Sequence, residues 1–315
     1  MPIESHDIDG PAGRLRLWEA ATADPEAAVL FVHGATYAGR SIFAPAALDP
    51  TWLRWTATDG RSAFAVDLRG YGESERPPAM DDPDTQEPPV RAAEAAEDVR
   101  AALGAVREEV DGPVHLVGTS WGTMIAGHLL TESDAPNVAS LTLHAPVFEP
   151  DPSLVEQFDA ADPPPTRKVT RAEARDRWDA QVPTDPPAAI REAKGGTDPV
   201  FDAFWSALAD SGQGVEGEDA IVAPNGTLAD IAAAAAGERP YDPAALDVPT
   251  LVVRGSLDPT STREDALGVY DALDLRDDEA VYAEIEGGTH FVHLERRRTA
   301  LFEAVGAFQR QYPPR

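Results

Sequence analysis

Hydrophobic residues in this chain gather in short apolar runs, separated by longer stretches in which they recur with helical spacing. We expect strands where the apolar runs occur, at 28–32, 62–67, 114–119, 139–144, 250–254 and 280–285. An opening hairpin is predicted at 3–8 and 13–19, around the turn Gly10-Pro11-Ala12-Gly13. Helical patterns alternate with these strands, the clearest at 90–110. The alternation predicts an α/β fold with a mostly parallel, eight-stranded sheet covered by helices on both faces.

The pattern changes between about residues 148 and 246. Strand patterns disappear there, and proline-rich breaks separate helical pieces near 170–181, 186–194, 199–210 and 227–236. We therefore expect a helical lid, inserted at 148–246 into a core formed by residues 1–147 and 247–315. A chain of 315 residues is long enough for one large domain with such an insertion.

The five residues Gly118-Thr119-Ser120-Trp121-Gly122 lie between a predicted strand and a helical pattern at 123–132. A serine at the apex of such a turn has a strained backbone and a side chain that points away from both flanks. Glycines two residues to either side suit a place where backbones approach too closely for a Cβ. The context favours a nucleophile for acyl transfer over a serine that only caps the helix.

A serine nucleophile needs a base to take its proton and an acid to orient that base. Asp258 and His290 each follow a predicted strand, and together with Ser120 they have the chain order serine, acid, histidine. The carboxyl ends of parallel strands share one edge of a sheet, so these groups are expected together. Three alternatives stay open, namely His293 as the base and, after the strand at 139–144, Glu149 or Asp151 as the acid.

Backbone amides are needed to hold the oxyanion that forms during acyl transfer. One is expected from Trp121, directly after the nucleophile, and the other from Ala35, in the loop after the strand at 28–32. Gly34 would let this loop turn its amide inward. His33 immediately follows the early strand, and we expect it to brace the loop because the base should come last in the chain.

These motifs, with Asp67-Leu68-Arg69-Gly70-Tyr71-Gly72-Glu73-Ser74 and Gly288-Thr289-His290-Phe291, span nearly the whole chain. In this order they resemble the α/β-hydrolase-fold serine hydrolases. The resemblance implies a catalytic triad of Ser120, Asp258 and His290, oxyanion amides from Ala35 and Trp121, and a structural role for Asp67 and Arg69. It implies hydrolysis of a small or medium carboxylic ester, with no cofactor and no metal.

The resemblance leaves the subclass open. Serine at 120, where epoxide hydrolases and dehalogenases would have aspartate, argues against these two activities. Trp121 after the serine resembles proline iminopeptidases, but His33-Gly34-Ala35-Thr36 departs from their usual His-Gly-Gly-Pro loop. Thioesterase, perhydrolase and carbon–carbon bond hydrolase activities stay open, as does a non-catalytic protein that binds a small ligand. Five aromatic side chains are expected in the substrate pocket: Tyr37, Phe148, Phe204, Trp205 and Phe291. For Phe204 and Trp205, a small core within the lid is the alternative.

Charge and composition indicate the kind of cell and the class of partner to expect. The formal net charge is −29, from 55 acidic and 26 basic residues, and Lys168 and Lys194 are the two lysines. Acidic residues scattered along the chain with few lysines are typical of proteins from salt-accumulating halophiles, although an ordinary acidic protein stays an alternative. A phosphate backbone would be repelled, so nucleic acid is not an expected partner.

The residue types present and the N-terminal residues indicate the compartment to expect and argue against a metal site. There are no cysteines, which excludes disulfides and thiol catalysis. Residues 1–10 are polar and do not resemble a secretory signal, and no apolar run reaches 18 residues. We therefore expect a cytoplasmic enzyme with no membrane partner. The seven histidines are not spaced like metal ligands.

Overall fold

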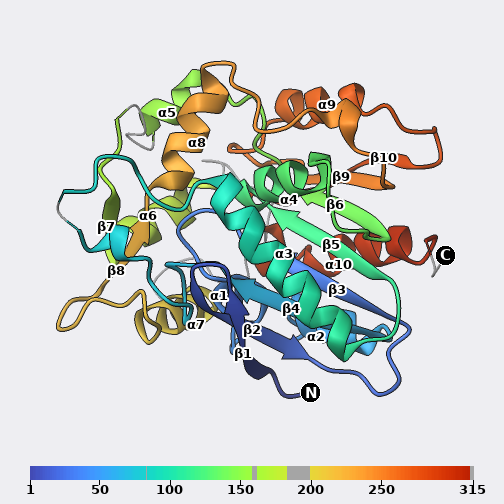
Figure 1. Cartoon of the computed structure of the whole chain (residues 1–315), viewed down its shortest axis with the longest axis horizontal. Coiled ribbons are helices and arrows are strands. Elements are labelled where there is room, and N and C mark those ends of the chain that lie inside the picture. The colour runs from blue at the N-terminus through green and yellow to red at the C-terminus, as the bar shows by residue number, and fades with distance from the viewer. Residues whose placement is uncertain (83, 158–161, 183–198, 313–315) are drawn as a thin grey trace.

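A computed structural model describes residues 1–82, 84–157, 162–182 and 199–312. In this part of the chain, eight strands form one sheet in the spatial order β1-β2-β4-β3-β5-β6-β9-β10 (Figure 1). The strands are β1 (Glu4–Gly10), β2 (Gly13–Ala20), β3 (Ala27–Val32), β4 (Arg61–Asp67), β5 (Val114–Thr119), β6 (Ser140–His144), β9 (Thr250–Gly255) and β10 (Ala280–Ile285). The sheet is parallel from β4 to β10, and β1 and β2 extend it in antiparallel fashion. The predicted eight-stranded, mostly parallel sheet is confirmed.

Helices cover the sheet, as the periodicity predicts. In Figure 1, α3 (Ala92–Glu109) and α4 (Trp121–Thr131) lie in front of the central strands. On the other face, α2 (Trp52–Thr58) packs against α10 (Arg298–Gln309). The remaining elements of the core are α1 (Gly39–Phe43), α9 (Arg263–Ala272) and the 3-10 turns η1 (Pro78–Met80) and η3 (Val292–Leu294). None of the described helices combines the length and apolar character needed to cross a membrane.

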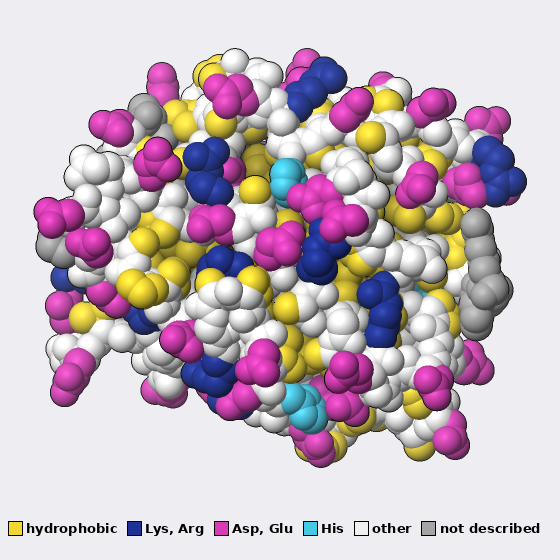
Figure 2. All heavy atoms as spheres, viewed as in Figure 1, with side chains coloured by type: hydrophobic (Ala, Val, Ile, Leu, Met, Phe, Trp, Pro, Cys, Tyr) yellow, Lys and Arg dark blue, Asp and Glu magenta, His cyan; other side chains and the backbone are white. Residues whose placement is uncertain are grey.

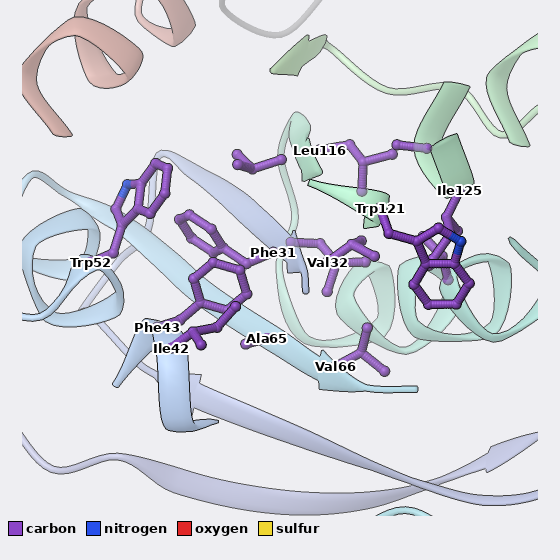
Figure 3. Packing of buried hydrophobic residues seen from close by; sticks show 14 of the residues in the cluster. Phe31, Val32, Ile42, Phe43, Trp52, Ala65, Val66, Leu116, Trp121 and Ile125 are labelled. Atoms are coloured by element: carbon purple, nitrogen blue, oxygen red, sulfur yellow. The ribbon is translucent and has the colours of Figure 1, made fainter. Parts of the chain in front are cut away.

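The core is built on central strands that are buried along their whole length, such as β3. Alternate residues of a strand face opposite sides of the sheet. The Phe31 ring lies 5.2 Å from Phe43 and 5.1 Å from Trp52. Beyond Val32, Figure 3 shows Trp121 of α4. Because both faces are covered, strands of this kind read as continuous apolar runs, which is why they could be predicted.

Residues 148–246, called here the inserted segment, contain strands that the sequence did not predict. Between β6 and β9 lie α5 (Pro152–Gln157), β7 (Thr166–Thr170), α6 (Arg171–Ala180), α7 (Pro199–Ala209), β8 (Ala220–Pro224), α8 (Gly226–Ala235) and the 3-10 turn η2 (Pro243–Ala245). The helices predicted at 170–181, 199–210 and 227–236 are confirmed, whereas that at 186–194 falls outside the described residues. The prediction that strands disappear here was wrong, because β7 and β8 pair as an antiparallel ribbon. β7 is only partly buried and mostly polar, so it lacks the apolar run that reveals a strand.

Candidate active site

Ser120 lies on a strained turn between β5 and α4. Its φ of 56° and ψ of −124° are unfavourable for a residue with a Cβ. The backbone N–H of Ser120 donates to the His144 carbonyl at 2.9 Å and so ties the turn to β6. A Cβ on Gly122 would lie 2.5 Å from the Val32 oxygen, and one on Gly118 would lie 2.4 Å from the Gly122 oxygen. The two glycines therefore permit the close backbone approach that presents Ser120.

Asp258 and His290 form a buried acid–base pair. His290 Nδ1 lies 2.8 Å from Asp258 Oδ2, and both residues are at most 5% exposed. The other carboxylate oxygen, Oδ1, accepts the backbone N–H groups of Thr260 at 2.8 Å and Ser261 at 2.9 Å. A carboxylate can only accept, so Nδ1 carries the proton and donates it to Asp258. In neutral His290, Nε2 is then left free to take a proton.

Arg254 fixes the loop that carries Asp258. This guanidinium group comes from β9, where it donates to the carbonyl of Asp258 at 2.9 Å and to that of Ser261 at 2.7 Å. Its charge is paired with Glu284 on β10. Arg254 was not predicted from the sequence, although an arginine in an otherwise apolar strand is a signal for such a buried role.

Ser120 and His290 line the same small cavity, whose volume is about 30 Å³. It lies at the carboxyl ends of the parallel strands, where sheets of this type place their sites. The lining residues are Gly34, Ala35, Tyr37, Ile42, Thr119, Ser120, Arg177, His290, Phe291 and His293. The structure thus brings the expected nucleophile and the expected base to one cavity, with Asp258 in contact with the histidine.

The two expected oxyanion donors belong to the loop after β3 and to the start of α4. Ala35 lines the cavity, and Trp121 is the first residue of α4. The first amides of a helix have no acceptor within that helix, so the Trp121 N–H suits an external acceptor. A Cβ on Gly34 would lie 2.8 Å from the Ser120 Cβ. Only glycine lets the loop after β3 come this close to the serine.

His33 braces this loop, as expected from its place in the chain. The Leu68 N–H donates to His33 Nε2 at 3.1 Å, so the proton is on Nδ1, which donates to the Gly34 carbonyl at 2.8 Å. Burial lowers the pKa of His33 to about 4. A neutral imidazole therefore joins the loops that follow β3 and β4.

The alternative acids and base have different surroundings. Glu149 pairs with Arg239 at the surface, and exposed Asp151 accepts the Ser153 N–H at 2.8 Å. His293 lines the cavity, but neither of its ring nitrogens has a hydrogen-bond partner among the described residues. Burial holds the pKa of His293 well below its usual value. Of these candidates, only the pair of His290 and Asp258 has the contact that a base and its orienting acid require.

The aromatic candidates divide into two groups. Tyr37 and Phe291 line the cavity, whereas three others do not: Phe148, Phe204 and Trp205. Phe204 packs edge-on against Tyr37 with the ring centres 4.7 Å apart. Trp205 donates its Nε1–H to Asp219 at 2.6 Å. Phe204 and Trp205 are thus used in packing, the alternative left open by the sequence, and contact of these three side chains with a substrate stays a prediction.

Asp67 and Arg69 have structural contacts, as expected. Buried Asp67 accepts the Trp18 Nε1–H and the Gly39 N–H, both at 2.9 Å. Burial raises the pKa of Asp67 to about 6. Arg69 forms a salt bridge with Asp98 on α3, with Nη2 and Oδ1 2.6 Å apart. These contacts hold the loop after β4.

One group of possible metal ligands is found in the described part of the chain. Glu4, His6 and Glu19 place one ligand atom each within 4.8 Å of one another. They lie on the β1–β2 hairpin at the edge of the sheet, outside the cavity lining. His6 Nε2 and Glu19 Oε2 are already hydrogen-bonded to each other at 2.7 Å.

The sheet order, the serine turn after β5 and the acid and histidine after β9 and β10 define an α/β-hydrolase fold. The model of the alpha/beta hydrolase family matches residues 29–304. The chain therefore belongs to this family and is an α/β-fold hydrolase. Among curated proteins, none matches the chain significantly.

Solved structures of several hydrolases share this fold over 98% of the chain. An E-2-(acetamidomethylene)succinate hydrolase is 20% identical, with a TM-score of 0.66 and 99% of its own chain covered. An esterase from Exiguobacterium antarcticum is 17% identical, with a TM-score of 0.67 and 100% coverage. An epoxide hydrolase from Vigna radiata is 17% identical, with a TM-score of 0.65 and 98% coverage. Identities this low establish the fold, and the chemistry has to come from the site.

Proposed function

We propose that this protein is a serine esterase that hydrolyses small or medium carboxylic esters through an acyl-enzyme on Ser120. The observation that carries the proposal is the cavity wall shared by Ser120 and His290, with His290 held by Asp258 at 2.8 Å. A serine beside an oriented imidazole is the arrangement that activates a hydroxyl as a nucleophile. A serine in this position supports acyl transfer over epoxide opening, the activity named for one of the similar structures.

In the proposed acylation, Ser120 Oγ bonds to the ester carbon while its proton passes to His290 Nε2. The Ala35 and Trp121 N–H groups hold the oxyanion that forms. The carbon–oxygen bond to the alcohol then breaks, and His290 gives its proton to the departing alcohol. In deacylation, water bonds to the acyl carbon and loses a proton to His290. The carboxylic acid leaves as Ser120 regains the proton, so the enzyme is restored.

The inserted segment is proposed to act as a lid over this site, within a core made of residues 1–147 and 247–315. Support comes from Trp178 of α6, whose ring centre lies 4.9 Å from that of Phe291 on the cavity wall. The site needs a small-molecule ester and neither a metal nor a cofactor. We also propose that the enzyme works in the cytoplasm of a halophilic cell, in line with its net charge of −29.

The test is hydrolysis of p-nitrophenyl esters from acetate to dodecanoate, with Ser120→Ala as the variant and Ser153→Ala, at an exposed serine, as its control. Turnover should peak at one chain length and disappear in Ser120→Ala alone. A fluorophosphonate probe should label the wild type and the control but not Ser120→Ala. Unchanged hydrolysis by a folded Ser120→Ala protein would refute the proposal.

A further inference from the structure

The loop that carries the expected oxyanion amide of Ala35 is strained at the next residue, Thr36. Its φ of 73° is unfavourable for a β-branched side chain. The Tyr37 N–H donates to the Ala35 carbonyl at 2.8 Å, across Thr36. A hydrogen bond between residues two apart, around a residue of positive φ, is the pattern of a rare and strained kind of γ-turn. Strain of this kind persists only where neighbouring contacts hold it.

Gln213, in the inserted segment between α7 and β8, provides one such contact. Its Nε2 group donates to the Thr36 carbonyl at 3.0 Å and to the Val222 carbonyl at 3.3 Å. Its Oε1 atom accepts the Gly72 N–H, in the loop after β4, at 3.0 Å. Gln213 is 1% exposed, so its amide is buried. One side chain therefore joins the inserted segment to the loops that follow β3 and β4.

The β7–β8 ribbon fixes Gln213 and makes a second contact with Thr36. The Val222 N–H of β8 donates to the Gln213 carbonyl at 2.8 Å. Arg167 of β7 donates to Thr36 Oγ1. Thr36 is 1% exposed, and both its carbonyl and its hydroxyl are held by residues of the inserted segment. Both strands of the ribbon thus take part in holding the strained residue.

The conformation of Thr36 bears on the oxyanion site because Ala35 precedes it and lines the cavity with Ser120. If Thr36 relaxed to a negative φ, the neighbouring peptide groups would turn and Ala35 would move with them. An oxyanion donor is effective only when it is aimed at the position where the charge develops. A contact that keeps Thr36 strained is therefore suited to aiming the Ala35 N–H.

We infer that Gln213 is a positioning residue for the oxyanion amide of Ala35, which it aims by holding Thr36 in its strained conformation. The inserted segment then completes the active site as well as covering it. The inference rests on the proposed esterase function and deepens it. Loss of the Gln213 contacts should slow the chemical step more than it weakens ester binding, because the oxyanion develops only in the transition state.

The main variant is Gln213→Met, which keeps the length of the side chain and removes its hydrogen bonds. For p-nitrophenyl butyrate, kcat should fall about tenfold to hundredfold, less than for loss of a whole oxyanion donor, while KM stays within about threefold. If this variant does not fold, Gln213→Asn replaces it, since a side chain shorter by about 1.5 Å cannot reach both loops.

Gln309→Met is the matched control, because it also removes the amide of a buried glutamine. Gln309 is 2% exposed, lies on α10 outside the cavity lining, and accepts a hydrogen bond from Arg61. Its replacement should leave kcat and KM unchanged. All variants are checked for folding by circular dichroism. An equal loss of kcat in the control would overturn the inference, and so would a rise of KM in Gln213→Met without a fall in kcat.

A glycine at position 36 separates positioning from a general structural effect. Glycine adopts a positive φ without steric cost, so it does not depend on Gln213 to stay there. The fall in kcat caused by Gln213→Met should be about tenfold smaller in the Thr36→Gly background, the factor that a left-handed conformation costs a residue with a Cβ. An equal fall in the two backgrounds would mean that strain at Thr36 is not what Gln213 controls, and the inference would be wrong.

Hydrogen exchange tests the inference without any turnover. Residues 33–38 should exchange faster in Gln213→Met than in the wild type, because the hydrogen bond between Tyr37 and Ala35 opens when the turn relaxes. Mass spectrometry of the peptides that cover this loop measures the rate. Faster exchange, absent from Gln309→Met, supports the inference even if no ester is hydrolysed. Unchanged exchange overturns it, whatever the fate of the esterase proposal.

Discussion

Replacing Asp258 by asparagine tests the proposed triad with a minimal change of shape. The Asp258 carboxylate accepts two backbone N–H groups on Oδ1 and the His290 Nδ1–H on Oδ2. In Asp258→Asn, the amide oxygen can keep the two backbone hydrogen bonds, which turns the NH₂ group toward His290. An NH₂ group donates, so Nδ1 must accept and the proton moves to Nε2. That tautomer cannot take a proton from Ser120.

The size of the effect follows from this exchange of tautomers. A triad histidine held in the wrong tautomer lowers kcat by about 10⁴-fold. At 1.36 kcal/mol for each factor of ten, this is a loss of about 5.4 kcal/mol of transition-state stabilisation. The fold should change much less, because the two backbone hydrogen bonds survive. We expect the free energy of unfolding to fall by about 1 kcal/mol, the typical worth of one hydrogen bond.

The assay is steady-state hydrolysis of p-nitrophenyl butyrate, with unfolding in guanidinium chloride followed on the same samples. Glu149→Gln is the control, because Glu149 is the alternative acid after β6 and its carboxylate pairs with Arg239 instead. It should leave kcat within about twofold, as expected for a weak surface ion pair outside the cavity lining. If Asp258→Asn kept more than a tenth of the wild-type kcat, or if Glu149→Gln lost as much activity, the assignment of the acid would be wrong.

Three further predictions concern stability. Asp98→Ala should lower the free energy of unfolding by about 3–5 kcal/mol, because it leaves the largely buried Arg69 without its partner. If the double variant Arg69→Met/Asp98→Leu recovers the lost stability in chemical denaturation, the unpaired charge is the cause. Burial lowers the pKa of His115 to about 4, so between pH 6.5 and 4 the unfolded chain takes up a proton that the native state does not. The unfolding free energy of the wild type therefore falls as the pH is lowered through this range. In His115→Asn, which can keep the hydrogen bond to Ser140, this fall should be smaller by about 1.4 kcal/mol per pH unit. Parallel curves of unfolding free energy against pH for the two proteins would contradict this. Raising KCl from about 0.1 to 3 M should raise Tm as the surface charges are screened, and a Tm that does not depend on salt would argue against the halophilic setting.

The positions of Ser120, Asp258 and His290 could be predicted because local pattern and topology agree. Ser120 and Asp258 follow β5 and β9, which are buried along their whole length and mostly apolar, as expected for parallel strands covered on both faces. His290 follows β10, which is partly buried but still mostly apolar. Once the sheet is parallel, its strand ends meet at one edge, and residues far apart in sequence are brought together. The geometry of Asp258 and His290 follows from that topology, with Arg254 adding a brace that the apolar pattern alone does not reveal.

The inserted segment was harder to predict because its structure depends on distant contacts. β7 pairs with β8, some fifty residues later, and its exposed polar residues show no apolar run. Phe204 and Phe291 are equally aromatic in the sequence, but only Phe291 lines the cavity. Whether a ring packs a small core or contacts a substrate depends on how the helices meet. For the same reason Arg177 was not predicted to line the cavity, because in the sequence it is one charged residue on a polar helix.

The spread of charge over the surface bears on how the protein responds to salt. Acidic side chains are distributed over the face seen in Figure 2, and the whole chain has 55 acidic residues against 26 basic ones. These like charges repel one another in the compact state, and salt at about 1 M shortens the range of that repulsion to about 3 Å. The unfolded chain holds the same charges farther apart, so it gains less from the screening. High salt should therefore favour the folded state, which is why the proposed halophilic setting predicts a Tm that rises with KCl.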